Sequence, residues 1–235
     1  MISLHLQQCW HPTALMSILE TAKSDPHFAE RRQMVQSQLR DRGIHDERVL
    51  EAMLRIPRHE FVSEEYQSQA YEDHPIPIGE NQTISQPFIV AASLQALSLQ
   101  GGESVLEVGT GSGYQTALLA VLARAVYSVE RHGTLAHSAE AILARLGLSN
   151  VKILVGDGSH GVPEFAPYES ILVSAAAPSI PQSLFDQLAE KGRMVIPVGP
   201  QHSQELQLVH KRDRKAMVEV IEGCRFVPLI GAEGY

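Results

Sequence analysis

Cysteine is scarce in this chain of 235 residues, which has only Cys9 and Cys224. The two positions lie far apart and show no metal-ligand spacing, and a single pair does not build the disulfide framework of a small secreted domain. A chain of this length can bury a sizeable core without such bonds. We therefore expect a protein of a reducing compartment, the cytoplasm, with a bacterial periplasm as the alternative.

Long apolar runs and an early basic cluster are also missing. No apolar stretch approaches the roughly 20 residues that cross a bilayer. The first Lys or Arg is Lys23, so the chain lacks the basic start of a secretory signal. The formal net charge is −8. Because nucleic acids and anionic membranes attract basic surfaces, we expect neither as a partner, and we take a monomer as the default.

The chain divides into three parts. Residues 1–28, where Pro12 and Pro26 flank a weakly apolar stretch, fit the rest poorly. Three interpretations are open for them: a disordered N-terminal extension, a short helix, or sequence upstream of the true start codon. We assign them no chemistry. Residues 29–100 are predicted to be a region of helices and loops, and residues 101–235 an α/β core. The last two parts together form one predicted domain.

Two helices are predicted in the first of these regions. A helical apolar period over residues 34–39 stops at Gly43, a common helix-ending residue. Asp46 is a predicted N-cap for a second helix, which Pro57 ends. Residues 71–86 carry prolines, glycines and polar side chains without a period, which predicts a loop.

Short β-branched runs then alternate with helical ones. The predicted strands are Ser104–Val108, Ala125–Val129, Val151–Val155, Ser170–Val173 and Met194–Val198. The predicted helices between them are Gly113–Ala123, Leu135–Leu146 and Gln182–Leu188. This alternation predicts a doubly wound α/β fold, Rossmann-like, with a mostly parallel sheet. Three further runs, around 206–209, 218–221 and 226–229, have no helices between them and are predicted to be antiparallel additions.

A glycine loop is the most informative segment. An apolar strand leads into Gly109-Thr110-Gly111-Ser112-Gly113 and then into a helix, whose free N–H groups can face a ligand. The spacing differs from the G-x-G-x-x-G of dinucleotide folds. Glu107, just before the first glycine, would repel a pyrophosphate but attract a methionine-derived ammonium group. The loop therefore favours S-adenosylmethionine over NAD, with a simple connecting turn as the structural alternative.

Two more acidic residues follow predicted strands. Glu130 is placed where a carboxylate accepts hydrogen bonds from ribose hydroxyls. Asp157, before Gly158, is placed to accept from the exocyclic amine of adenine, although an Asp-Gly turn explains it equally well. Since the carboxyl ends of parallel strands share one sheet edge, we expect Glu107, Glu130 and Asp157 to meet there around the cofactor.

Several motifs resemble one enzyme family. They are Tyr71-Glu72-Asp73-His74-Pro75-Ile76-Pro77-Ile78-Gly79, Gln82-Thr83-Ile84-Ser85-Gln86-Pro87, the segment from Leu106 to Tyr114, Gly156-Asp157-Gly158, Ala166-Pro167-Tyr168, Ala175-Ala176-Ala177-Pro178, Gly192-Arg193 with Ile196-Pro197-Val198-Gly199, and Phe226-Val227-Pro228-Leu229. From about Met34 to the C-terminus the chain closely resembles the protein-L-isoaspartate O-methyltransferases. The glycine loop is common to many methyltransferases, whereas the segment around Ser85 is far more specific.

The resemblance implies a fold and a reaction. It implies one methyltransferase domain over 29–235, with the helical region on the substrate side and a distinctive strand order near the C-terminus. The implied activity is methyl transfer from S-adenosylmethionine to the free carboxylate of L-isoaspartyl residues in damaged proteins and peptides, leaving S-adenosylhomocysteine. The ester would cyclise to a succinimide, whose hydrolysis returns some normal aspartate, so the implied process is protein repair.

The resemblance also marks Ser85 as catalytic. We interpret its hydroxyl as a donor that orients the substrate carboxylate, with Thr83 as a neighbour in the same loop. Placed before Gln86-Pro87, Ser85 could equally cap a helix, and both roles could hold. Because a carboxylate is already ionised at neutral pH, the reaction needs no general base. The sequence accordingly shows no catalytic triad.

Two departures from the family pattern stand out. Glu169 and Ser170 follow Ala166-Pro167-Tyr168 where the family usually has an Asp, a residue with a structural role. Ile230 stands where some relatives carry a cofactor-contacting Thr, so we do not carry that contact over.

Three other functions are consistent with the sequence. The chain could methylate another acceptor, bind S-adenosylmethionine or a nucleotide without catalysis, or be an NAD-dependent dehydrogenase, which Glu107 disfavours. His132, His137 and His160 lie near the predicted site in sequence but have no partners at metal-ligand spacing. We therefore expect no metal.

Overall fold

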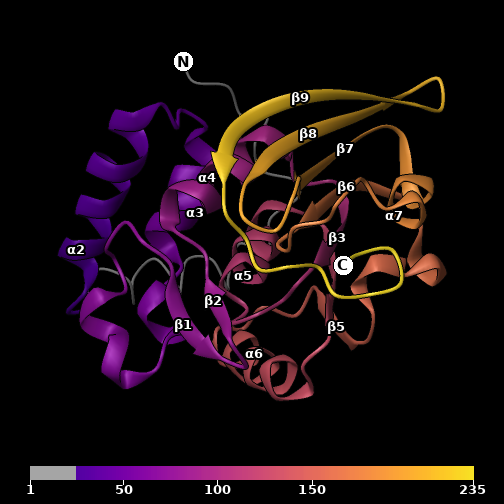
Figure 1. Ribbon diagram of the computed structural model, residues 1–235. Coiled ribbons are helices and arrows are strands. Elements are labelled where there is room, and N and C mark those ends of the chain that lie inside the picture. The colour runs from indigo at the N-terminus through magenta and orange to yellow at the C-terminus, as the bar shows by residue number, and fades with distance from the viewer. Residues whose placement is uncertain (1–24) are drawn as a thin grey trace.

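A computed structural model describes residues 25–235 (Figure 1). Residues 1–24, which include Cys9 and most of the predicted extension, lie outside the described residues. The main sheet has the strand order β5-β4-β3-β6-β7-β8-β9. Its strands are β3 (Ser104–Val108), β4 (Ala125–Glu130), β5 (Val151–Val155), β6 (Tyr168–Val173), β7 (Leu188–Val198), β8 (Gln204–Arg212) and β9 (Lys215–Cys224).

The pairing of these strands confirms the predicted mixture. β3 to β7 are parallel to one another. β8 pairs antiparallel with β7 and with β9, and β8 and β9 form the long hairpin of Figure 1. The chain order runs one way from β3 to β5 and the other way from β6 onward. The carboxyl ends of β3 and β6 therefore diverge at a topological switch point, where α/β sheets bind ligands.

The prediction of a strand around residues 226–229 was wrong. This segment makes only a single parallel bridge, between Ala176 and Pro228. Ala176 N donates to Val227 O at 2.8 Å and Leu229 N donates to Ala176 O at 2.7 Å. Pro228 has no N–H to extend a ladder. The segment instead crosses the carboxyl edge of the sheet, which brings its side chains to the switch point.

The prediction of a loop over residues 71–86 was wrong in part. Residues Ile76–Gly79 (β1) and Gln82–Ile84 (β2) form a separate antiparallel hairpin. Its two turn residues, Glu80 and Asn81, have φ of 50° and 56°. Two left-handed residues make the turn that matches the twist of a hairpin. The hairpin carries the Thr83–Ser85 segment at its end.

The helices are α2 (Phe28–Gln33), which continues as helical turns to Arg42, α3 (Glu47–Arg55), α4 (Pro87–Leu97), α5 (Tyr114–Leu122), α6 (Gly133–Arg145) and α7 (Gln182–Gln187). The three helices predicted in the α/β core agree with α5, α6 and α7 to within two residues at each end, whereas the first helical stretch begins before the predicted period and α4 had no predicted range. Gly43 ends the first helical stretch with φ of 97°. Asp46 caps α3 by accepting from Arg48 N at 2.9 Å and from Val49 N. Both predicted helix signals are therefore confirmed.

The core has two layers, one on each face of the sheet. On β3, Val105 packs into the layer that α3, α4 and α5 cover, while Leu106 and Val108 pack into the opposite layer with α7. All five residues of β3 are buried. Glu107 therefore lies on the face that α5 covers, inside the protein.

The described chain begins with a buried charge pair. Arg31, with 0 % of its surface exposed, forms an ion pair with Asp25 and donates to Tyr71 Oη at 3.1 Å. Burial alone would raise the pKa of Asp25, but the His27 N–H and the Arg31 charge outweigh it and lower that pKa. The predicted boundary at residue 28 therefore cuts through a contact of the folded domain.

We predict that Asp25→Asn lowers the free energy of unfolding by about 3 kcal/mol, because it leaves a buried guanidinium without its carboxylate. Asp41→Asn, which neutralises an exposed carboxylate of the same region, is the control and should change stability by less than about 0.5 kcal/mol. Urea denaturation of both variants measures the difference. Equal stability of the two would show that Asp25 contributes nothing and that the domain begins later.

Candidate active site

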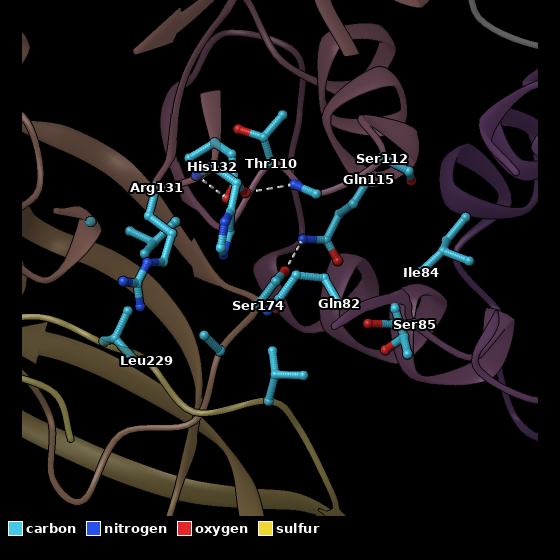
Figure 2. A pocket seen from close by; sticks show the side chains of 18 of the residues that line it. Gln82, Ile84, Ser85, Thr110, Ser112, Gln115, Arg131, His132, Ser174 and Leu229 are labelled. Carbon is cyan, nitrogen blue, oxygen red and sulfur yellow. Dashed lines mark hydrogen bonds between the residues drawn. The ribbon is translucent and has the colours of Figure 1, made fainter. Parts of the chain in front are cut away.

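A pocket lies at the switch point, at the carboxyl ends of β3 and β4 (Figure 2). Most of its lining comes from the end of the β1–β2 hairpin, the glycine loop with the start of α5, the residues after β4, and the segment that crosses the sheet edge. Single positions after β5 and in α4, and two residues after β6, complete it. Of the residues predicted from the sequence, those that line the pocket are Thr83, Ser85, Gly109, Thr110, Gly111, Glu130 and Gly158. Glu107, Gly113 and Asp157 do not line it.

The glycine loop has the backbone that its sequence requires. Gly111 has φ of 54° and its N–H points at the Glu130 carboxylate. Gly113 has φ of 88° and forms the N-cap of α5. A Cβ on Gly113 would lie 2.9 Å from the Ala139 Cβ, so this glycine permits close packing of α6 beneath the loop rather than contact with a ligand.

Glu130 is held from both sides by backbone donors. Gly111 N donates to its Oε2 at 2.9 Å and His132 N donates to its Oε1 at 2.9 Å (Figure 2). The residue is 5 % exposed, yet it lines the pocket. Each carboxylate oxygen can accept a second bond, so the fixed group can receive two neighbouring hydroxyls. This arrangement fits a ribose.

Glu107 occupies a different place from the one predicted. Its side chain is fully buried, and its Oε2 accepts from Thr116 Oγ1 and Ser128 Oγ at 2.6 Å each. Burial raises the pKa of Glu107 to about 7 against the opposing effect of these hydrogen bonds. The carboxylate therefore lies behind the pocket wall instead of facing a ligand.

Gln115 connects Glu107 to the pocket. Its Nε2 donates to Ser174 Oγ at 2.5 Å, as Figure 2 shows. The same Nε2 donates to Glu107 Oε1 at 3.2 Å. Both amide hydrogens are thereby used, which leaves the carbonyl oxygen of this pocket-lining residue to accept from a ligand. The sequence interpretation missed Gln115. Its position in the first turn of the helix after the glycine loop was the available signal.

Asp157 forms the turn that was the alternative to its cofactor role. Its Oδ1 accepts from Ser159 N at 2.9 Å, capping a short helical turn. Its Oδ2 accepts from Ala232 N at 2.9 Å. Burial acts to raise the pKa of Asp157, but these donors outweigh it and lower that pKa. Asp157 thus anchors the segment that follows Leu229, while its neighbour Gly158 lines the pocket.

Ser85 and Thr83 lie at the mouth of the pocket, where a second groove adjoins it. α4 begins after Gln86 and has no side-chain cap, so Ser85 does not take the capping role. Within residues 25–235 its hydroxyl has no hydrogen-bond partner, whereas its backbone oxygen accepts from Arg58 Nη2 at 2.8 Å. The backbone is fixed and the hydroxyl is available.

Arg58 is a second residue that the sequence interpretation missed. It is fully buried, donates from Nε to Ala70 O at 2.7 Å, and lies over the Tyr114 ring at 4.9 Å. Burial lowers its pKa to about 10, so it remains a cation at neutral pH. A positive charge therefore sits directly behind Ser85, where it favours an anionic substrate.

The histidines do not assemble a metal site. Within the described part of the chain, no three His, Cys, Asp or Glu side chains gather closely enough to hold an ion. His132 contributes its backbone N–H to Glu130, and His137 bonds to Gly133 O through its ring. In the same range, no helix combines the length and apolar character needed to cross a bilayer.

Comparison with known proteins decides the family. The model of the family protein-L-isoaspartate(D-aspartate) O-methyltransferase (PCMT) matches residues 29–234. The chain belongs to this family. The resemblance found in the sequence motifs is thereby confirmed, and so is the enzyme class, a methyltransferase that uses S-adenosylmethionine.

Similar proteins support the assignment over the whole domain. The protein-L-isoaspartate O-methyltransferase 1 of Syntrophobacter fumaroxidans is 53% identical over 205 residues, covering 87% of this chain and 96% of that protein. That of Methanoculleus marisnigri is 52% identical over 213 residues, covering 91% and 97%.

Solved structures of PCMT proteins share the fold. One protein-L-isoaspartate O-methyltransferase superposes with a TM-score of 0.79 at 32% identity, over 87% of this chain and 67% of the other. A Plasmodium falciparum protein, described as a putative family member in complex with S-adenosyl-L-homocysteine, superposes with a TM-score of 0.74 at 26% identity, over 85% and 98%. The predicted fold is confirmed.

The burial of Glu107 predicts a pH-dependent stability. The folded protein keeps a proton on Glu107 up to a pKa of about 7, while the unfolded chain releases it near the ordinary value of 4.5. The free energy of unfolding therefore falls as pH rises through this window, by about 3 kcal/mol from this group. Glu107→Gln has no such titration, so its stability relative to the wild type should rise by that amount between pH 5 and 8. Urea midpoints at the two pH values measure the change. A parallel pH dependence in both proteins would contradict it.

Proposed function

We propose that this chain transfers a methyl group from S-adenosylmethionine to the free carboxylate of L-isoaspartyl residues, which starts their repair through a succinimide. The observation that carries the proposal is the juxtaposition of Ser85, with its free hydroxyl, and Glu130, with its fixed carboxylate, in one pocket of a PCMT protein.

The cofactor side of the pocket suits its ligand group by group. We assign the ribose hydroxyls to Glu130, whose two oxygens are anchored by backbone donors. The Gln115 carbonyl oxygen suits the ammonium of the methionine part, since Glu107 and Ser174 orient its amide. Glu107 then acts through Gln115 and not by direct contact. Gly109, Thr110, Gly111 and Gly158 complete the wall.

Asp157 enters this proposal as a wall-building residue as well as the predicted acceptor for the adenine amine. Its carboxylate has accepted the Ala232 N–H and the Ser159 N–H. Those bonds hold the residues after Leu229 against the pocket, and they leave a lone pair on Oδ2 for an amine. Both roles fit one carboxylate.

The substrate side asks only for positioning. Bound S-adenosylmethionine supplies an activated methyl group on a sulfonium. Ser85 donates a hydrogen bond that orients the substrate carboxylate, with Thr83 beside it. Arg58 fixes the Ser85 backbone and favours the anion from behind. The carboxylate is ionised at neutral pH, so no side chain has to remove a proton.

The surroundings of the enzyme are also part of the proposal. We propose that the active form is a monomer. The net charge of −8 supports protein and peptide substrates without a nucleic-acid partner. Cys224 is a free thiol, which supports the cytoplasm as the compartment.

The test is methyl transfer from labelled S-adenosylmethionine to matched peptides, one with L-isoaspartate and one with normal L-aspartate. We expect base-labile label on the isoaspartyl peptide alone. Label on neither peptide, with cofactor binding confirmed by calorimetry, would leave a methyltransferase for another acceptor or a binding protein without catalysis.

Mutations should separate the two sides of the site. We predict that Glu130→Ala raises the Kd of S-adenosylhomocysteine about 10- to 100-fold, because it removes charge-assisted hydrogen bonds. Ser85→Ala should leave this Kd within about twofold and lower kcat on the isoaspartyl peptide about tenfold or more. Calorimetry and steady-state kinetics give the two quantities. Unchanged affinity in the first variant would refute the ribose assignment, and unchanged kcat in the second would refute the role of Ser85.

A further inference from the structure

A second groove opens beside the cofactor pocket, on the substrate side of Ser85. It has a volume of about 880 Å³ and shares Thr83, Ser85 and Ser174 with the pocket. Its other walls come from the start of α4, from the loop between β7 and β8, and from the end of β9 with the residues that follow it. Because Ser85 marks the reacting carboxylate in the proposed function, on which this inference rests, the groove is where the flanking residues of a peptide substrate lie.

The charge of this groove is opposite to that of the chain. Among residues 25–235, its lining includes Arg225 and His202 but no Asp or Glu. The chain as a whole has 27 acidic residues against 19 Lys and Arg. Cys224 also lines the groove, but burial raises the pKa of its thiol to about 11, so it stays neutral. The nearby carboxylates of Glu222 and Glu205, which also raise that pKa, lie outside the lining.

Arg225 projects from a fixed backbone. The preceding residue, Cys224, pairs with Gln204 at the end of β9. The following residue, Phe226, donates its N–H to Gln204 Oε1 at 2.9 Å. Gln204 itself is 2 % exposed. The base of the Arg225 side chain is therefore held at the groove, while within residues 25–235 its guanidinium has neither an ion pair nor a hydrogen bond. It is free to pair with a ligand anion.

We infer that Arg225 selects isoaspartyl peptides that carry a second carboxylate, from Asp or Glu, close to the damaged residue. A guanidinium recognises a carboxylate through paired N–H donors. The groove offers no carboxylate of its own to compete for this cation. Its occupant is thus an acidic peptide segment in an extended form, and His202 adds a weaker contribution at the same wall.

The experiment compares isoaspartyl peptides that differ only in Glu or Gln, placed at each neighbouring position in turn. For the wild type, we expect at least one position at which Glu raises kcat/KM about threefold or more over Gln at low salt. Screening should remove this ratio in about 1 M salt, where the Debye length falls to about 3 Å. Arg225→Gln should bring the ratio to one. Arg225→Glu should invert the charge preference, so that a peptide with Lys at the same position is methylated better than the Glu peptide.

The control is Lys215→Gln, which removes one positive charge at the other end of β9, about 30 Å away along the strand. It should keep the wild-type ratio. Binding of S-adenosylhomocysteine by calorimetry shows that each variant is folded. Since each result is a ratio between two peptides, a general loss of activity does not imitate the expected outcome.

Two results would overturn the inference. One is a wild-type ratio of one at every position, with the Gln peptides methylated normally, which leaves the proposed function intact. The other is a Glu-to-Gln ratio of kcat/KM that stays unchanged in Arg225→Gln. That result would mean that Arg225 contacts either the reacting carboxylate or no carboxylate of the substrate. Failure to methylate any isoaspartyl peptide would instead contradict the proposed function itself.

Discussion

The buried guanidinium of Arg58 is the constraint on which the substrate side of this enzyme depends. A cation removed from water must be satisfied by fixed acceptors, and here the acceptors are the backbone oxygens of Ala70 and Ser85, with the Tyr114 ring beneath. One side chain thereby ties the helical region and the β1–β2 hairpin to the first turn of α5. The segment that carries Ser85 has its place because this charge has to be satisfied.

The acidic residues of the site divide their work according to burial. Glu130 faces the pocket, and two backbone N–H groups fix the orientation of its carboxylate. Glu107 is buried on the same sheet edge, where its influence passes through the amide of Gln115. The difference follows from the pleat of the sheet: Glu107 is an interior position of β3, while Glu130 is the last residue of β4. Two carboxylates with similar sequence contexts therefore serve different purposes.

Local signals predicted what depends on short-range physics. The strand Ser104–Val108, the cap at Asp46 and the stop at Gly43 all follow from period, capping and backbone preference. The sequence could not show which way a carboxylate points. Glu107 was expected in the pocket, but its Oε2 accepts from Thr116 and Ser128 behind the pocket wall. Asp157 also accepts from Ala232, which lies far along the chain. The segment Phe226–Leu229 was predicted to be a strand because its residues are apolar. The sequence does not show that it crosses the sheet edge. Arg58 and Gln115 could not be identified from the sequence, because their partners come close to them only in the folded protein.

The bond between Asp157 and Ala232 has a consequence for the order in which the enzyme is made. The glycine loop and Glu130 leave the ribosome early, but a domain generally folds as a unit. The wall contributed by Val227, Leu229 and Ile230 is delivered about a hundred residues later. A growing chain therefore lacks one wall of its cofactor pocket until the ribosome has made this segment. Only then can Asp157 accept the Ala232 N–H that holds the wall in place.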